Sequence, residues 1–216
     1  MKYSTLIFDL DGTLIDQFSA IHKSVNHVQK CLGFEISDYK TVKSAVGGSV
    51  RLTLERLFQH ASLNETLPLF KPHFESIMMD EVFILPGILD FLKASQKSGI
   101  KMAVFTNKIG GHARSTLEHL KIDKYFELIL GAEDTPYRKP DPRFTEHLLQ
   151  KLNTLASDCC LIGDSPFDWE TGSLVDIPVF LVATGTHTIS QLKRTTNSNA
   201  IYSDINALAT ELFNYK

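Results

Sequence analysis

The sequence of 216 residues contains few cysteines and no long apolar run, and each lack excludes a class of protein. Cysteine occurs only at Cys31, Cys159 and Cys160, which is too few for a disulfide-stabilised secreted fold and suits a reducing compartment. No apolar stretch approaches the roughly 20 residues that a membrane span requires. Asp9 and Asp11 interrupt the N-terminal apolar run where a signal peptide is apolar. We therefore expect a cytoplasmic protein with no membrane partner.

Basic charge is also scarce. The chain has 22 Lys and Arg residues against 25 Asp and Glu residues, which gives a formal net charge of -3. The basic residues are scattered along the chain, whereas nucleic-acid binding needs a basic surface that contacts phosphates. We therefore expect no nucleic-acid partner. The hydrophobic content of 43% is typical of an ordinary globular protein with a sizeable core.

Short apolar, β-branched runs recur along most of the chain and predict strands. They cover residues 4–10, 100–106, 126–130, 159–163, 178–182 and, more weakly, 199–202. Helical patterns lie between them. Residues 88–97 place an apolar stripe on one face before Gly99, and Pro142 opens a helix whose expected buried residues are Phe144, Leu148, Leu149 and Leu152. Strands that alternate with helices predict an α/β fold, with a Rossmann-like parallel sheet covered on both faces.

Residues 17–82 break this alternation. Apolar residues recur there at helical spacing, from Phe18 to Leu32 before Gly33 and again in two later stretches. We therefore predict an all-helical cap domain at 17–82, inserted into a core domain formed by 1–16 and 83–216. The insertion starts just after the first strand, at the edge where open α/β sheets bind ligands. For that reason we expect the cap to act as a lid over the site.

Two acidic turns follow predicted strands. "LIFDLDGT" places Asp9 at the end of the first strand and Asp11 two residues later, and "LIGDSPFD" places Asp164 at another strand end with Asp168 one helical turn further on. Either turn alone is more typical of a capping or turn-forming aspartate. Carboxylates from two separate strand ends together predict a Mg²⁺ site, because proteins hold this ion with one or two carboxylates and substrate phosphate.

Two further segments carry groups that bind anions. "AVFTNK" ends a predicted strand with Thr106 and Asn107, and "YRKPDP" holds Lys139 in a loop bounded by proline. Taken singly, these residues are as well explained by a helix N-cap or a solvated surface lysine. Together with a carboxylate nucleophile and a divalent cation, they favour phosphoryl transfer, in which positioning and charge stabilisation supply most of the acceleration.

The four elements "DLDGT", "TNK", "KP" and "GDSPFD", in this order, resemble those of the haloacid dehalogenase superfamily, and the resemblance covers nearly the whole chain. The helical insertion is similar to the subclass I cap, and "TNK", "KPDP" and "GDS" resemble the phosphoglycolate phosphatase branch. This resemblance implies a Mg²⁺-dependent phosphatase. It implies that Asp9 attacks phosphorus to form an aspartyl-phosphate, and that Asp11 protonates the leaving oxygen and then activates water.

The same resemblance implies the roles of the remaining motif residues. The metal ligands would be Asp9, Asp164 and the main-chain carbonyl of Asp11. Thr106 and Asn107 would bind phosphoryl oxygens. Lys139 would neutralise the nucleophile and the phosphate, with Asp168 as an orienting acid beside it.

In the expected cap, "VGGSVR" resembles the substrate-specificity loop of these relatives. Arg51 is expected to bind a substrate carboxylate there, although a solvated helix arginine is nearly as good an explanation. The expected partner is a small phosphorylated metabolite. The sequence departs from the family after Asp168, where Trp169 and Glu170 follow and Asp176 replaces the usual glycine. We therefore expect that corner to be reshaped.

Two other functions stay open. A phosphomutase of the β-phosphoglucomutase type would use the same chemistry, but "GDS" in place of the glutamate of many sugar mutases argues mildly against it. A non-catalytic binding protein of the same fold is disfavoured because none of the six motif residues is lost. The sequence is compatible with a monomer or a homodimer, and it does not select one phosphate ester.

Overall fold

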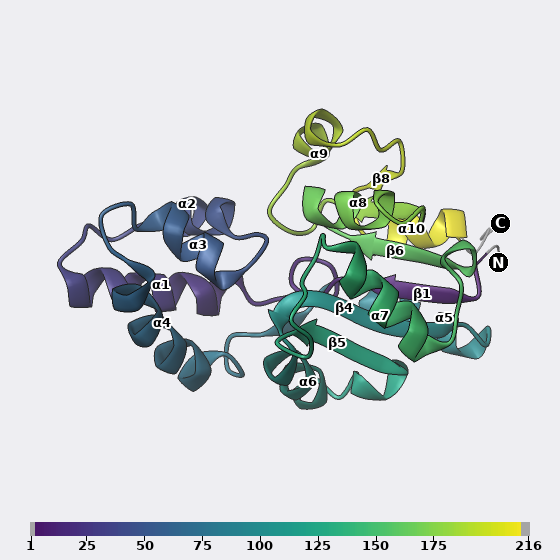
Figure 1. The fold of residues 1–216 in the computed structure, drawn as a ribbon, viewed down its shortest axis with the longest axis horizontal. Coiled ribbons are helices and arrows are strands. Elements are labelled where there is room, and N and C mark those ends of the chain that lie inside the picture. Colours follow the sequence, from purple (N-terminus) through teal and green to yellow (C-terminus); the bar gives the residue numbers. More distant parts are fainter. Residues whose placement is uncertain (1–2, 213–216) are drawn as a thin grey trace. The chain divides into compact units, whose positions relative to one another are not determined.

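The computed structural model describes residues 3–212 and contains the predicted parallel sheet. Its six strands are β1 (Thr5–Phe8), β4 (Lys101–Ile109), β5 (Leu128–Ala132), β6 (Cys159–Gly163), β7 (Val179–Val182) and β8 (Ile201–Tyr202). They lie in the order β5-β4-β1-β6-β7-β8, and every neighbouring pair is parallel (Figure 1). The α/β class and the parallel sheet are confirmed.

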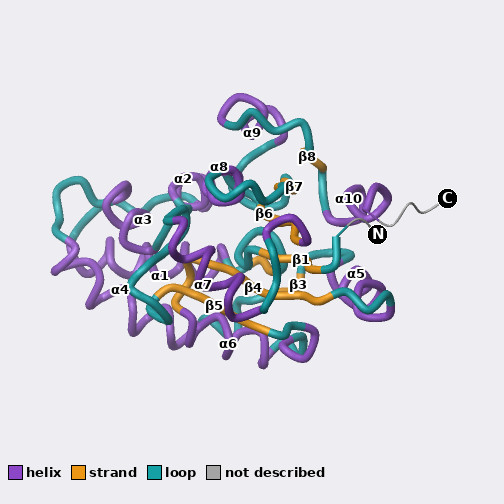
Figure 2. The backbone as a smooth tube through the Cα atoms, turned by 45° about the vertical axis from the view of Figure 1, so that its right-hand side comes forward, coloured by secondary structure: helices purple, strands orange, loops and turns teal. Residues whose placement is uncertain are grey.

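Helices alternate with these strands along the chain (Figure 2). They are α5 (Ile88–Lys97), α6 (Gly110–His119), α7 (Pro142–Leu152), α8 (Pro166–Ser173), α9 (Ile189–Thr195) and α10 (Ile205–Leu212), with 3₁₀ turns at Asp123–Tyr125 and Ala156–Asp158. In α7 the buried stripe follows Phe144, Leu148 and Leu152. Leu149 lies beside that stripe and packs against the same core, but it is only half-buried, so it is less buried than predicted.

The two faces of the sheet are covered by different helices. Consecutive strand residues point to opposite faces. Ile7 packs in one cluster with Phe105 of β4 and Phe144 of α7, whereas the Phe8 ring meets the ring of Phe91 in α5 edge to face, with 6.0 Å between centroids. Burial on both faces explains why β1 is a continuous apolar run in the sequence.

The strand β4 is longer than the sequence indicates. The sequence pattern predicts an end at Thr106, but the strand continues to Ile109, which pairs with Ala132 of β5. The register shifts between Phe105 and Ile109. The polar residues in this irregular stretch do not alternate with apolar ones as they do in a typical half-buried strand. The sequence pattern therefore predicts an end of the strand that is too early. The consequence is that residues 106–108 lie at the carboxyl end of a central strand.

Contacts between residues divide the chain into two compact units. The sheet unit contains the residues up to Ile15 and from Ile84 onward, and the helical unit is Asp16–Phe83. Two short strands, β2 (Ile15–Asp16) and β3 (Phe83–Ile84), pair where the chain passes between the units. The lid role expected for residues 17–82 stays a prediction.

The helical unit consists of α1 (Phe18–Leu32), α2 (Tyr39–Ala45), α3 (Val50–Leu57) and α4 (Leu63–Ile77). As predicted, α1 ends at Gly33, whose left-handed φ of 74° costs glycine little. The helix α4 contains Pro68 and Pro72, each of which lacks an amide hydrogen. Its buried Phe70 and Phe74 contribute to a core that α1 and α3 also enter, and this packing offsets the lost bonds.

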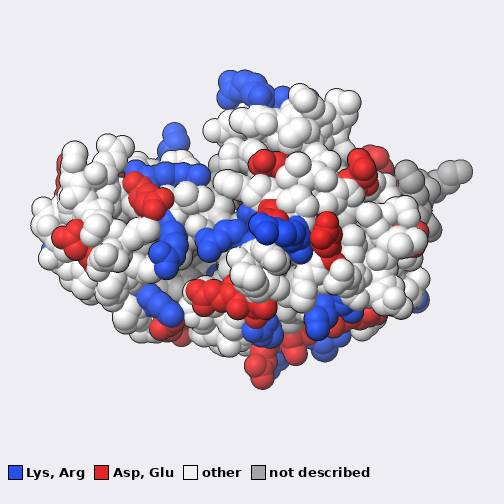
Figure 3. All heavy atoms as spheres, viewed as in Figure 1, with Lys and Arg blue, Asp and Glu red and all other residues white. Residues whose placement is uncertain are grey.

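Three further features complete the description. Among residues 3–212, no helix is both long enough and apolar enough to cross a bilayer. On the face drawn in Figure 3, Lys and Arg side chains are interspersed with Asp and Glu. At the corner after α8, Asp176 adopts a φ of 57°, a left-handed conformation that aspartate tolerates better than most residues. The chain therefore turns there without a glycine at position 176.

Candidate active site

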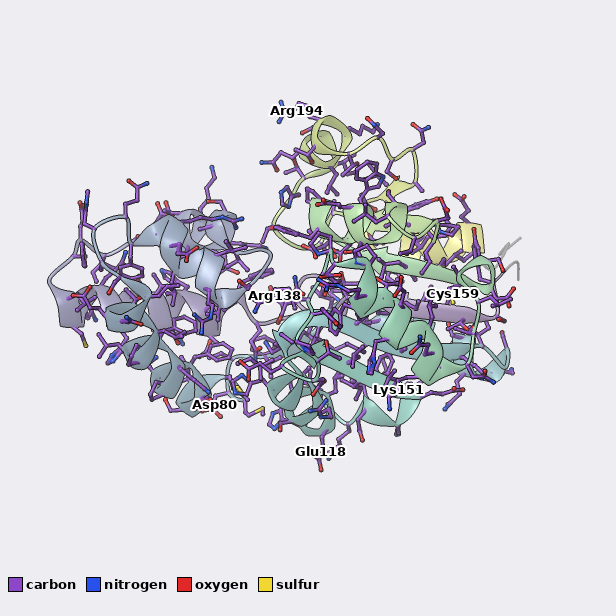
Figure 4. All side chains as sticks on the ribbon, in the orientation of Figure 1. Asp80, Glu118, Arg138, Lys151, Cys159 and Arg194 are labelled. Carbon is purple, nitrogen blue, oxygen red and sulfur yellow. The ribbon has the colours of Figure 1, made fainter. Side chains whose placement is uncertain are left out.

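The buried ammonium of Lys139 joins two of the predicted acids. Lys139 lies in the loop that leads into α7. In Figure 4 this loop is found at the label of the preceding residue, Arg138, and the C-terminal end of α7 is found at the label of Lys151. The Nζ atom donates to Asp9 Oδ1 at 2.8 Å and to Asp168 Oδ1 at 2.6 Å. Lys139 is only 4% exposed. The predicted grouping of a lysine with these two acids is therefore present in the structure.

Asp168 is fixed in this arrangement by the start of α8. Its Oδ2 accepts hydrogen bonds from Ser165 N at 3.1 Å and Ser165 Oγ at 2.6 Å, while Oδ1 accepts from Lys139. The capping box thus orients the carboxylate that holds the lysine. A side chain at Gly163 would place a Cβ 2.3 Å from Asp168 Cγ, so the strand end must be glycine for Asp168 to pack here.

Three acids can present oxygens to one cation. Asp9, Asp164 and Asp168 each offer a carboxylate oxygen within 4.8 Å of the others, and all three are buried. Hard oxygen donors of this kind fit Mg²⁺. Because both oxygens of Asp168 already accept hydrogen bonds, Asp9 and Asp164 are the better placed ligands.

Burial disfavours the ionised forms of Asp9 and Asp164. Burial raises the pKa of Asp9 to about 6, an effect that Lys139 opposes and that Asp168 and Asp11 reinforce. The pKa of Asp164 is also well above its usual value, through burial and the neighbouring carboxylates of Asp168 and Asp9. A bound cation would relieve this repulsion and restore the ionised forms.

The same carboxylates keep Lys139 charged. Burial lowers the pKa of its ammonium, but Asp168 and Asp9 outweigh that effect and raise the pKa above its ordinary value. Lys139 is therefore a fixed positive charge at the carboxyl edge of the sheet, available to neutralise an anion there.

The two predicted phosphate-binding residues at the end of β4 differ in their contacts. Thr106 is buried, and its Oγ1 accepts from Lys108 N at 3.2 Å, which leaves the hydroxyl proton available. The Asn107 side chain instead holds the main chain of Lys139, with Nδ2 donating to Lys139 O at 3.0 Å and Oδ1 accepting from Lys139 N at 2.8 Å.

Asp11 has a partner that sequence reasoning did not identify. Lys108 Nζ lies 3.1 Å from both Asp11 Oδ1 and Oδ2, and the Lys108 side chain is 8% exposed. Lys108 is the last residue of the "TNK" segment, so the signal was its position at the same strand end as Thr106. The Asp11 carboxylate is thus turned toward β4, and the cluster of close acids contains Asp168 rather than Asp11.

A loop after β7 also contacts the site and was not singled out from the sequence. Thr186 N donates to Asp164 Oδ2 at 3.2 Å, and Thr184 Oγ1 donates to Gly12 O at 2.6 Å. The only signal in the sequence was the polar, small-residue stretch "ATGTHT" at the end of an apolar strand.

Arg51 belongs to the helical unit and lies in the first turn of α3 with an exposed side chain. The preceding loop contains Gly47 and Gly48, both with positive φ. This loop is held by Arg56, which sequence reasoning did not identify and whose Nη1 donates to Ala45 O at 2.8 Å and Gly47 O at 3.0 Å.

Comparison with known proteins adds a family context to this geometry. The family model described as "Haloacid dehalogenase-like hydrolase" matches residues 6–182. A phosphoglycolate phosphatase of Mesorhizobium japonicum is 29% identical over 219 residues, which cover 98% of this chain and 96% of the relative. A relative from Caldanaerobacter subterraneus subsp. tengcongensis that carries a pyrophosphatase name, PpaX, is 33% identical over 169 residues, covering 78% and 76% of the two chains.

Solved structures share the fold. A protein of Clostridium acetobutylicum described as a predicted phosphatase superposes with a TM-score of 0.89 at 23% identity, covering 99% of this chain and 100% of that one. At this identity, the similarity shows the fold alone.

Proposed function

The chain belongs to the haloacid dehalogenase-like hydrolase family and is a phosphatase, and we propose that it hydrolyses small phosphate monoesters with Mg²⁺ through an aspartyl-phosphate on Asp9. One observation carries the proposal. The buried Lys139 donates to both Asp9 and Asp168, and Asp164 offers an oxygen to the same cluster. This arrangement combines a nucleophile, a fixed positive charge and a pair of metal ligands at one edge of the sheet.

The proposed reaction has two steps. In the first, a carboxylate oxygen of Asp9 bonds to phosphorus, the ester P–O bond breaks, and the leaving oxygen takes a proton from Asp11. In the second, Asp11 removes a proton from water, the water oxygen attacks phosphorus, and inorganic phosphate leaves Asp9 as a carboxylate. Lys139 balances charge on the nucleophile and the phosphoryl group, and the hydroxyl of Thr106 donates to a phosphoryl oxygen.

We propose that Asp9, Asp164 and the main-chain carbonyl of Asp11 hold Mg²⁺. When bound, the ion would neutralise negative charge on the phosphoryl group and bring it close to Asp9. The buried carboxylates support this assignment, because ionised acids at such a site need a compensating charge.

The proposed substrate is a small ester similar to phosphoglycolate. The name of the Mesorhizobium relative supports this class, and Arg51 offers an exposed guanidinium for a second anionic group. The expected monomer or homodimer and the expected cytoplasmic location stay predictions.

A substrate panel tests the proposal. The panel contains phosphoglycolate, p-nitrophenyl phosphate, pyrophosphate and a hexose 1-phosphate, each assayed with Mg²⁺ and with excess chelator. We expect Mg²⁺-dependent phosphate release that is fastest with phosphoglycolate and absent from Asp9→Asn prepared in parallel. Rapid acid quench with ³²P-labelled substrate should trap label on the wild type only. Isomerisation of the hexose phosphate without net phosphate release would favour a phosphomutase, and inactivity on the whole panel would favour a binding protein.

A further inference from the structure

The loop after β7 reaches two neighbouring strand ends that carry the acidic turns. In the sheet, β6 lies beside β7, and β1 lies beside β6. Thr186, which follows β7, donates its main-chain N–H to Asp164 at the end of β6. Thr184 donates its hydroxyl to the carbonyl of Gly12, next to Asp11 in the loop after β1. One short segment therefore ties together the loops that bear Asp11 and Asp164, and all of these residues lie in the sheet unit.

The Asp164 carboxylate is packed tightly against this segment. An added Cβ at Gly185 would lie 1.7 Å from Asp164 Oδ2, and one at Gly12 would lie 2.8 Å from the same oxygen and 2.8 Å from Gly185 Cα. The carboxylate thus fits against two glycines, and neither position leaves room for a side chain. Asp164 is only 4% exposed, so the carboxylate is enclosed by protein atoms.

The hydrogen bond to Asp164 also distinguishes its two oxygens. Oδ2 accepts from Thr186 N at 3.2 Å, and among residues 3–212 no hydrogen bond to Oδ1 is found. The loop therefore holds one oxygen and leaves the other as the acceptor available to a cation. A ligand atom that is already oriented loses less conformational freedom when metal binds.

We propose that Thr184, Gly185 and Thr186 form a positioning segment that sets the metal affinity of the site by fixing Asp164 against the loop that carries Asp11. The proposal rests on the proposed function, because it takes the Asp9 and Asp164 cluster as the Mg²⁺ site. Thr184 acts through its hydroxyl on Gly12, Gly185 acts by leaving room for the carboxylate, and Thr186 acts through its main-chain N–H. None of the three is placed in contact with substrate.

Substitutions in this segment should therefore change the metal affinity by different amounts. Thr184→Val keeps the side-chain shape but removes the hydroxyl, and Thr184→Ser keeps the hydroxyl. Thr210→Val, which removes an exposed hydroxyl that donates to Asn206 O within α10, is the matched control. We expect Thr184→Val to weaken metal binding about 10-fold, toward the lower end of the range typical of groups that orient metal ligands. Thr184→Ser and Thr210→Val should bind metal within about twofold of wild type on the same basis. Gly185→Ala should weaken binding more, because the added methyl group displaces Asp164.

The experiment measures metal binding directly on full-length protein without substrate. Mn²⁺ affinity is followed by electron paramagnetic resonance and Mg²⁺ affinity by calorimetry, with thermal unfolding in chelator to report folding. The expected pattern is a higher metal Kd for Thr184→Val at an unchanged melting temperature in chelator, with recovery in Thr184→Ser. Equal affinity of Thr184→Val and wild type would overturn the inference while leaving the proposed function intact. A wild type that binds neither metal would overturn both, and metal-binding wild type without phosphatase activity would overturn only the function.

Discussion

The side chain of Asn107 holds the main chain of Lys139 on both sides, donating from Nδ2 to its carbonyl at 3.0 Å and accepting at Oδ1 from its amide at 2.8 Å. The two residues are 32 positions apart and come from β4 and from the loop before α7. The Nζ atom of the same lysine bridges Asp9 and Asp168. The two Asn107 hydrogen bonds therefore link the end of β4 to the lysine whose positive charge balances these acids. Asn107 is therefore well placed to position Lys139.

Replacing Asn107 separates this role from direct phosphate binding. We expect Asn107→Ala to lower kcat by roughly 10- to 100-fold with a small change in KM, because a displacement of catalytic groups of about 1 Å is enough for such a loss. A residue that bound phosphate equally in ground and transition states would instead raise KM at constant kcat. Steady-state kinetics on p-nitrophenyl phosphate distinguishes the two outcomes, and a pure KM effect would contradict the positioning role.

Asp9→Asn should remove turnover and stabilise the metal-free protein. The pKa of Asp9 is raised by burial to about 6 in the folded state, so the folded protein binds this proton more tightly than the unfolded chain does. Proton binding at Asp9 therefore stabilises the folded state. This stabilisation is complete below the ordinary pKa of 3.8, and it is lost as the pH rises through about 6. We therefore expect the metal-free variant to melt several degrees above wild type at pH 8, roughly the effect of 1 to 2 kcal/mol, and to match it near pH 4.

The measurement is thermal unfolding in excess chelator at both pH values. Glu118→Gln, an exposed acid labelled in Figure 4, is the control for loss of one surface charge. A melting temperature of Asp9→Asn at or below that of wild type at pH 8 would contradict the expectation.

Metal binding should weaken in acid. Mg²⁺ binds the carboxylate form of Asp9, and that form disappears as the pH falls through about 6. We expect calorimetric Mg²⁺ affinity to fall by up to about 10-fold per pH unit below 6 for each proton displaced. The raised pKa of Asp164 would make the decrease steeper. An affinity that does not change between pH 5 and 8 would place the metal elsewhere.

The sheet and part of the site could be predicted from sequence because their signals are local. The apolar run before Asp9 and the spacing of Phe144, Leu148 and Leu152 depend on neighbouring residues only. The strand ends of a parallel sheet then meet at one edge, which is enough to bring Lys139 near Asp9.

What the sequence did not reveal depends on long-range contacts. Thr184 meets Gly12 across 172 positions, and Lys108 meets Asp11 across 97. Nothing in "ATGTHT" or in "TNK" specifies the partner, because the direction of these side chains is set by packing after the strands have assembled. The same reason explains why Asn107 could be expected at the site but not its contact with Lys139.

Lys108 should matter most when the leaving group needs a proton. It contacts both oxygens of Asp11, the proposed acid, and thereby restrains that carboxylate. We expect Lys108→Met to lower kcat/KM by about 10-fold or more on an alkyl phosphate, within the contribution of general acid catalysis, and by much less on p-nitrophenyl phosphate, whose leaving group is stable as an anion. Similar losses on both substrates would show that Lys108 acts on binding or folding rather than through Asp11.

Arg51→Ala tests substrate recognition by the helical unit. The Arg51 side chain is exposed in the first turn of α3, after a loop that Arg56 holds in place. If Arg51 binds the carboxylate of phosphoglycolate, its loss should cost on the order of 2 to 5 kcal/mol, or about 30-fold or more in kcat/KM, on that substrate. An uncharged aryl phosphate has no group for Arg51 to bind, so its kcat/KM should change little.

Arg194→Ala, at the exposed arginine of α9 that Figure 4 labels, is the matched control and should affect neither substrate. Equal and small effects of Arg51→Ala on both substrates would remove the carboxylate contact and the main reason for preferring phosphoglycolate, while leaving the proposed chemistry of Asp9 and Asp11 unchanged.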